Sequence, residues 1–216
     1  TISYSWGYYA ATNGTVGNRS SLKAALNTIL VGHVELSYDD CWEALHETDQ
    51  DWGNPNNVLL LYSQRSTPKT FQDDGSGGDR WNREHVWAKS HGEFGTAKGP
   101  GTDIHALRAA DASVNSIRNA KDFDEGGEVL SGESAGDCPS CRADSDSFEP
   151  PDVVKGDIAR MLFYMAVRYE GGSTEVDLEL VDATGTPFGS GTSTTLGLLG
   201  KLGTLKRWHV EDPVRE

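Results

Sequence analysis

The amino-acid sequence predicts a single α+β domain, mainly helical, with a strand–strand–helix unit at its centre, at about residues 81–120. The first observation behind this fold class is the length, because 216 residues can form one sizeable hydrophobic core. The second is that some segments show helical apolar spacing while others are short apolar runs of strand composition. The third is that no internal repeat and no clear linker occur, so residues 1–216 are expected to form one domain.

Two helices are expected in the N-terminal part of the chain. Residues 1–17 are rich in Tyr, Gly and Thr and are expected to pack irregularly. The first helix extends to about Leu30, and either Ser20 or Ser21 can cap it by accepting a hydrogen bond from a free backbone N–H group. Ser37 can cap the second helix, whose apolar side chains are expected to face the core.

The middle of the chain predicts strands followed by a helix. The continuous apolar run at residues 57–62 predicts a buried strand, and residues 64–80, rich in Gly, Ser and Asp, predict a loop. Residues 82–88 have strand composition, and a second strand is expected at 103–107 after a Gly-rich connection. A helix is then expected at about 109–119, which completes the order strand, strand, helix.

The C-terminal part predicts one long loop and two helices. Residues 122–152 are acidic and rich in Gly and Ser, and a loop of this length is usually functional or held by ligands or disulfides. Residues 155–169 have the clearest helical spacing and are expected to be core. A last helix is expected at 193–208, although three glycines weaken it.

The predicted central unit contains the side chains with the most distinctive chemistry. The carboxylate of Glu84 stands beside the imidazole of His85, and the carboxamide of Asn115 follows on the predicted helix. Basic side chains surround all three. A divalent metal that binds a phosphate needs oxygen ligands, a base for the attacking water and cations that hold the substrate. The central unit offers all of these groups.

The order of several motifs resembles the endonuclease I family of secreted, sequence-nonspecific nucleases, which belongs to the ββα-metal (His-Me finger) group. The resemblance covers most of residues 20–212 and implies a central ββα-metal motif at about 81–120. It also implies an extracellular protein in its mature form, since no signal peptide is recognised at the start. The motifs are Leu36–Tyr38, Trp42–Leu45, Asn57–Tyr62, Asn82–Gly92, Thr102–Arg108, Val114–Asn119 and Gly156–Glu170.

The resemblance also implies roles for individual residues. His85 matches the general base that takes a proton from water, a role that suits an imidazole. Glu84 and Asn115 match the metal ligands, with Mg²⁺ as the expected ion and Mn²⁺ or Ca²⁺ as substitutes. Asn119, one helical turn later, competes with Asn115 for this role. Because neighbouring strand residues point to opposite faces, Glu84 and His85 can share a site only if the backbone bends or twists. Arg118 is a candidate catalytic phosphate clamp.

The net charge of −14 is unusual for a nucleic-acid binder, but the charge is unevenly distributed. Residues 80–121 contain seven basic and four acidic side chains, whereas the rest of the chain contains 12 basic and 29 acidic ones. A local basic region on an acidic body suits an enzyme that binds a polyanion and releases it, although chance clustering is the alternative. The basic residues expected to contact the substrate backbone, each of which could instead be a solvated charge, are Arg83, Lys89, Lys98 and Arg108.

The three cysteines favour one local disulfide. Cys138 and Cys141 form a single CxxC with no second half of usable spacing for a zinc site. We therefore expect a Cys138–Cys141 disulfide, with two free thiols as the alternative. Cys41 falls among the apolar positions of a predicted helix and is expected to be an unpaired core residue.

The sequence thus predicts a secreted metal-dependent endonuclease, and the family resemblance implies products with 5′-phosphate ends. DNA is the expected substrate, and RNA remains open as a second or main substrate. Contacts to the backbone alone would give little sequence preference. No apolar run is long enough to span a membrane, and a monomer is expected. A different class of function also remains open: a non-catalytic surface module whose acidic loop at 122–152 holds Ca²⁺.

Overall fold

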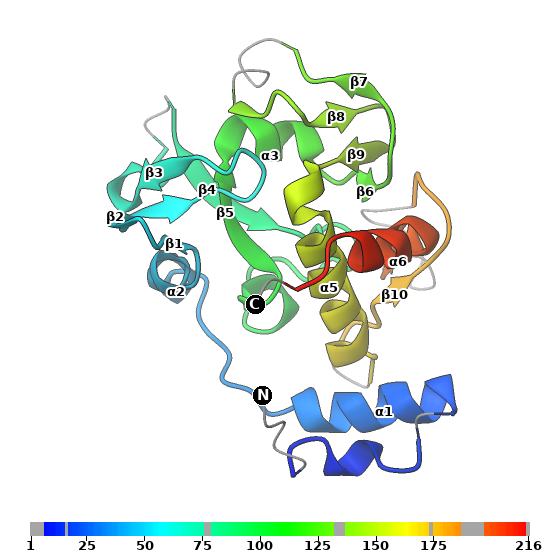
Figure 1. Ribbon diagram of the computed structural model, residues 1–216. Coiled ribbons are helices and arrows are strands. Elements are labelled where there is room, and N and C mark those ends of the chain that lie inside the picture. Colours follow the sequence, from blue (N-terminus) through cyan, green and yellow to red (C-terminus); the bar gives the residue numbers. More distant parts are fainter. Residues whose placement is uncertain are drawn as a thin grey trace.

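The computed structural model describes residues 7–15, 17–75, 79–131, 137–172, 175–186 and 197–214. Helix accounts for 35% and strand for 20%, so the α+β class is confirmed, with helix exceeding strand (Figure 1). That residues 1–216 form one domain stays a prediction. The helices are α1 (Arg19–Leu30), α2 (Asp40–Thr48), α3 (Ala112–Arg118), α5 (Asp152–Arg168) and α6 (Leu202–Glu211), and the 3₁₀ turns are η1 (Ala10–Thr12), η2 (Lys69–Phe71) and η3 (Pro100–Thr102).

The strands of the described residues form four small sheets. One is the antiparallel order β1-β2-β3, one is the antiparallel pair β4-β5, one is the order β6-β9-β8-β7, and the last is the parallel pair β10-β11. The strands are β1 (Gln50–Asp51), β2 (Asn54–Leu59), β3 (Ser66–Pro68), β4 (Trp81–His85), β5 (Leu107–Asp111), β6 (Asp122–Phe123), β7 (Glu128–Val129), β8 (Arg142–Ala143), β9 (Ser147–Glu149), β10 (Glu179–Leu180) and β11 (Leu198–Leu199).

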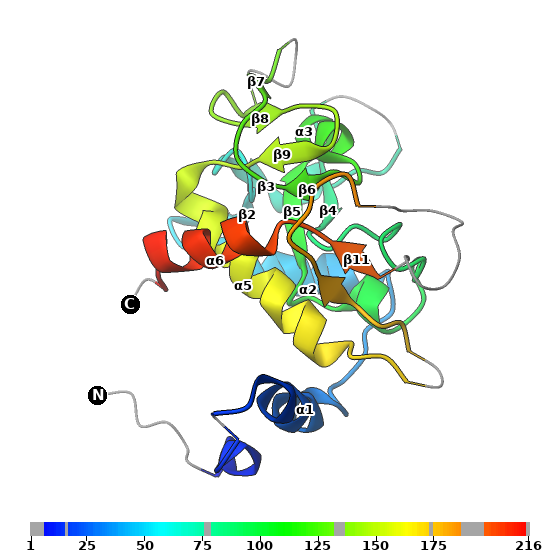
Figure 2. The same ribbon diagram turned by 90° about the vertical axis from the view of Figure 1, so that its right-hand side faces the viewer.

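The larger hydrophobic cluster surrounds α5. This helix buries Ile158, Leu162 and Met165, as their helical spacing predicts. Val114 of α3 and Trp208 of α6 belong to the same cluster. Figure 2 shows α6 crossing α5, while α1 lies at the far end of α5 from the β6–β9 sheet. There Asn27 of α1 donates to the carbonyl oxygens of Val167 and Arg168 of α5. Helix α5 is therefore the element around which the rest of this cluster packs.

A second hydrophobic cluster lies between α2, β2 and the β4-β5 pair. Cys41 and Leu45 of α2, Val58 of β2, Trp81 of β4 and Leu107 of β5 are all buried in it. Since Val86 directly after β4 and Ala110 of β5 belong to the larger cluster, the β4-β5 pair is packed between the two. This pair, followed at once by α3, confirms the order strand, strand, helix.

The predicted boundaries of the second central strand were wrong. It was expected at 103–107, but β5 spans Leu107–Asp111 and pairs with β4 so that Glu84 lies opposite Arg108. The physical reason is a side-chain turn: Asp103 accepts a hydrogen bond from the backbone N–H of His105 at 3.0 Å. Such a turn competes with strand pairing, so the ladder starts only after it.

Other predicted elements also differ from the structure. Asn18, not a serine, caps α1 by accepting a bond from the N–H of Ser21 at 3.0 Å. Residues 122–152, expected to be a loop, contain the short strands β6 to β9, which are too brief to show a periodic pattern. The last helix starts at Leu202 instead of about 193, although residues 187–196 lie outside the described part. At Gly200 a Cβ would stand 1.6 Å from the Ala183 carbonyl oxygen, so this backbone approach requires glycine.

Candidate active site

Glu84, His85 and Asn115 line one cleft of about 640 Å³. Strand β4 and the segment that follows it contribute most of the lining, and α3 contributes the rest. Tyr38 and Asn82 also line it, although the sequence assigned neither of them a role at the site. The lining residues are Tyr38, Asn82, Arg83, Glu84, His85, Ala88, Lys89, Ser90, Asn115, Ser116, Arg118 and Asn119.

Glu84, one of the lining residues, is a buried carboxylate that is only 1% exposed. The Tyr62 hydroxyl donates a hydrogen bond to its Oε1 at 2.6 Å, and a guanidinium nitrogen of Arg118 lies 3.3 Å from the same oxygen. Burial raises the pKa of Glu84, and the positive charge of Arg118 opposes that rise. Because both contacts fall on Oε1, the second oxygen is left for a cation, which would favour the ionised carboxylate.

His85 is held by the backbone of the η3 turn. Its Nε2 lies 3.0 Å from the carbonyl oxygen of Gly101. A carbonyl oxygen can only accept, so Nε2 carries the proton and Nδ1 keeps its lone pair. The ring is 9% exposed, and burial lowers the pKa of His85 to about 3. At neutral pH the imidazole is therefore uncharged, as a proton acceptor must be.

Asn115 reaches the cleft from α3. Its Nδ2 donates to the side-chain oxygen of Asn82 at 2.7 Å, so this bond leaves the Asn115 amide oxygen unused. The competing Asn119 also lines the cleft, but it ends α3 with a positive φ of 50° and is exposed. A carboxylate oxygen and an amide oxygen are hard donors of the kind that Mg²⁺ accepts. Glu84 and Asn115 therefore fit a divalent cation.

Arg118, predicted as a phosphate clamp, is 1% exposed and bonded to the backbone. Its guanidinium donates to the carbonyl oxygens of His85 at 2.8 Å and Val86 at 2.7 Å, and it lies over the ring of Phe123. These contacts tie α3 to the end of β4. The catalytic role of Arg118 stays a prediction, and its geometry favours holding Glu84 and His85 in place.

Of the four predicted substrate-binding cations, two line the cleft. Arg83 stacks over the rings of Tyr38 and Trp42, with its guanidinium carbon 3.4 and 4.0 Å from their centres. Lys89 is partly exposed at the cleft and is the better placed of the two for a phosphate.

The other two predicted cations are not brought to this cleft. Arg108 lines a separate cleft of about 680 Å³ and donates to the carbonyl oxygens of Ile104 and Leu107. Lys98 is exposed and does not belong to the lining of the His85 cleft. Any contact of these two residues with substrate stays a prediction.

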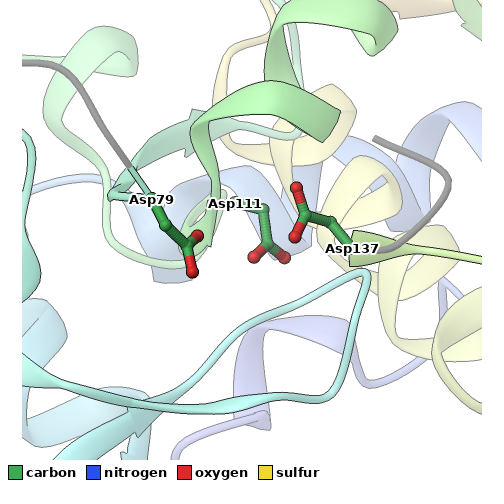
Figure 3. Close-up of side chains that lie close together, drawn as sticks. All are labelled: Asp79, Asp111 and Asp137. Atoms are coloured by element: carbon green, nitrogen blue, oxygen red, sulfur yellow. The ribbon is translucent and has the colours of Figure 1, made fainter. Parts of the chain in front are cut away.

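Three carboxylates that do not belong to the lining of the His85 cleft lie close together (Figure 3). One oxygen from each of Asp79, Asp111 and Asp137 lies within 4.8 Å of the others, a spacing that a metal ion could bridge. The guanidinium of Arg65, however, bonds Asp79 at 2.7 and 2.8 Å, bonds Asp111, and lies 3.6 Å from Asp137. Arg65 thus already supplies positive charge to this cluster.

Cys138 and Cys141 are joined by a disulfide, and Cys41 is a buried free thiol. The sulfur of Cys138 lies 3.5 Å from the carbonyl oxygen of Tyr62, the residue whose hydroxyl holds Glu84. The sequence assigned no role at the site to Tyr62 or Gly101, because each lies on a segment separate along the chain from the residue that it contacts.

The model of the endonuclease I family matches residues 18–216 of the chain. The chain belongs to the endonuclease I family. The family also includes two similar relatives named extracellular ribonuclease, from Bacillus amyloliquefaciens and Bacillus subtilis (strain 168). The chain is 55% and 53% identical to them over 207 residues, which are 96% of this chain and 66% of each relative. The chain therefore spans just under two thirds of the length of each of these two relatives.

Proposed function

We propose that this chain is a secreted, metal-dependent endonuclease that hydrolyses phosphodiester bonds with little regard to base sequence and leaves 5′-phosphate ends. The observation that supports this most is the convergence of Glu84, His85 and Asn115 on one cleft. Asn115 comes from α3 and the other two from β4, so the fold gathers a carboxylate, an imidazole and an amide that the chain separates. We take this gathering as a ββα-metal site.

In the proposed reaction His85 accepts the proton of the attacking water at Nδ1. The Gly101 carbonyl holds the ring by accepting from Nε2, so the basic nitrogen faces away from that turn. Glu84 and Asn115 would hold Mg²⁺, and Mn²⁺ or Ca²⁺ could replace it. When bound, the cation would stabilise negative charge on the scissile phosphate as a Lewis acid. Lys89 would bind a neighbouring phosphate by charge alone, which agrees with weak sequence preference.

DNA is the proposed substrate, and RNA is the second candidate. The two Bacillus relatives carry the name extracellular ribonuclease, which favours RNA cleavage and secretion for this chain as well. No helix among the described residues is both long enough and apolar enough to cross a lipid bilayer. The alternative of a Ca²⁺-binding module without catalysis has little structural support. Among the described residues one group of carboxylates, Asp79, Asp111 and Asp137, has the spacing of metal ligands, and Arg65 already neutralises part of its charge.

The test is cleavage of plasmid DNA and of a folded RNA, each with Mg²⁺ and with excess chelator. We expect cleavage that chelator abolishes. His85→Ala should lower turnover by about 10²–10⁴-fold, the usual contribution of a general base. His209→Ala, which removes an exposed imidazole on α6, is the matched control and should stay near the wild-type rate. Full activity of the His85 variant, or no cleavage of either substrate by the wild type, would refute the proposal.

A further inference from the structure

We propose that Asp103 is a positioning residue for His85, acting through the η3 turn that it ends; this rests on the proposed role of His85 as the base. Asp103 lies near neither the water nor the phosphate in this scheme. It would act by fixing the carbonyl group that orients the imidazole. Tyr164 of α5 and Tyr169 directly after it both donate to Asp103, so the C-terminal end of α5 would also help to position the base.

Asp103 is a buried carboxylate whose two oxygens are both engaged. It is 4% exposed. The hydroxyls of Tyr164, near the C-terminal end of α5, and of Tyr169, directly after α5, donate to its Oδ2 at 2.9 and 3.0 Å. His105 lies 3.0 Å from Oδ1 through both its backbone N–H and its Nδ1. These hydrogen bonds hold the Asp103 carboxylate in position, because the loss of any one of them would leave part of its buried negative charge without a partner.

The same turn contains the carbonyl group that holds His85. Asp103 directly follows η3 (Pro100–Thr102), and the Gly101 carbonyl oxygen lies 3.0 Å from Nε2 of His85. The turn is rigid within itself, since the N–H of Gly99 donates to the Thr102 hydroxyl at 3.2 Å. A Cβ at Gly101 would stand only 2.3 Å from the Gly95 carbonyl oxygen, so the backbone at Gly95 lies directly against the turn. A shift of Asp103 would therefore move the Gly101 carbonyl.

A purely structural role for Asp103 would lower stability without changing the imidazole. Asp122 offers a matched comparison, because it is also a buried carboxylate. It is 1% exposed and accepts from the backbone and hydroxyl of Thr186 and from the backbone of Gly200. Its described contacts do not include the η3 turn or His85. Asp103→Asn and Asp122→Asn should therefore both destabilise the fold, and only the first should disturb the base.

The experiment measures thermal stability, steady-state kinetics, Mg²⁺ affinity by calorimetry, and the ¹⁵N chemical shifts of the His85 ring. For Asp103→Asn we expect turnover to fall by about 10- to 100-fold, the effect of a small misplacement of a reacting group. The Michaelis constant and Mg²⁺ affinity should change by less than about twofold. The ring shifts should show a mixture of the two neutral tautomers, with the proton on Nδ1 instead of Nε2 in part of the molecules. Asp122→Asn should leave turnover and ring shifts unchanged.

Two further variants keep the proposal testable if Asp103→Asn fails to fold. Tyr164→Phe and Tyr169→Phe each remove one hydroxyl from the carboxylate and keep the ring. Their double variant should reproduce the loss of turnover and the altered ring shifts. Unchanged His85 shifts in a folded variant, or a loss of turnover no larger than that of Asp122→Asn, would overturn the role of Asp103. The proposed nuclease function would survive that result if the wild type cleaves and His85→Ala does not.

Discussion

Glu84 and Asn115 differ in how firmly the protein holds them. The Glu84 carboxylate is buried between Tyr62 and Arg118, whereas the Asn115 amide is held by Asn82 and is partly exposed. A buried carboxylate costs several kcal/mol to ionise unless charges or hydrogen bonds compensate it. A cation that supplies further compensation should therefore bind the Glu84 carboxylate together with the Asn115 amide oxygen.

The first prediction concerns these two residues and the competitor Asn119. Glu84→Ala and Asn115→Ala should each weaken Mg²⁺ binding by about 10- to 100-fold, because each removes one protein oxygen from the site. Asn119→Ala, the control on the same helix, should weaken it by less than about threefold. Calorimetric titration with Mg²⁺ measures this directly. If Asn119→Ala loses affinity and Asn115→Ala does not, the amide ligand has been assigned to the wrong asparagine.

His85 makes a second residue-scale prediction, on stability against pH. Burial lowers its pKa from 6.5 to about 3, so the unfolded chain takes up a proton below pH 6.5 while the folded protein does not. Its contribution to stability is therefore present above pH 6.5 and is lost as the pH falls towards 3. Between pH 7.5 and 5.5 this loss should be about 1.4 kcal/mol.

Urea unfolding of wild type and His85→Gln at the two pH values, without added metal, tests this. Glutamine does not titrate, so the variant should lose about 1.4 kcal/mol less free energy of unfolding than the wild type. Comparing the two proteins removes the effect of other titrating groups such as Glu84. His209→Gln, at an exposed position, should behave like the wild type. Equal losses in wild type and His85→Gln would show that the imidazole is not desolvated.

At the scale of elements, the site depends on how α3 and β4 are joined. The Arg118 guanidinium at the end of α3 donates to the carbonyl groups of His85 and Val86 at the end of β4. The opposite side of the β4-β5 pair packs on α2 through Trp81 and Leu107. Strand β4 is therefore fixed from two sides, and the relative placement of Glu84 and Asn115 follows from it.

The disulfide gives a prediction for the β7–β9 segment. Cys138–Cys141 closes a loop of four residues, for which chain entropy gives about 2 kcal/mol of stabilisation. The Cys138→Ala/Cys141→Ala variant should therefore melt about 4–8 °C lower in a protein of this size. Reductant should lower the melting temperature of the wild type towards that of the variant and leave the variant unchanged. Peptide mass mapping that finds both loop thiols free, or finds Cys41 bridged, would contradict this pairing.

At the scale of the whole molecule, the proposed function requires an acidic chain to bind a polyanion. The net charge is −14, and Lys89 is a partly exposed cation at the edge of the His85 cleft. Attraction to nucleic acid should therefore be local and should weaken as salt screens it. Few phosphate contacts also mean a shallow dependence of affinity on salt concentration.

The last prediction follows from this charge distribution. Lys89→Ala should raise the Michaelis constant equally for two DNA duplexes of unrelated sequence, and it should reduce the salt slope by about 1, the value for one phosphate contact. Lys206→Ala, which removes an exposed cation on α6, is the control and should change neither quantity. A loss that differs strongly between the two duplexes would mean that the protein reads bases.

The sequence by itself determined the α+β class, the strand–strand–helix order and the family. These follow from local patterns: apolar spacing along α5, strand composition around Glu84 and His85, and the order of the motifs. Local patterns gave the wrong bounds for the strand expected at 103–107, where the Asp103 side chain accepts from the N–H of His105 and strand pairing starts only at Leu107. They also missed the strands within 122–152, each of which is two or three residues long.

Only the tertiary structure decided which groups surround the candidate site residues. Tyr62 reaches Glu84 and the Gly101 carbonyl reaches His85 across turns of the chain, so no spacing rule could find them. The tertiary structure also buries Arg118 and places Arg108 in another cleft, although the sequence predicted substrate contacts for both. The physical reason is that a basic side chain has the same local pattern whether it faces solvent or backbone carbonyls. Its burial and its partners are set by packing between distant segments.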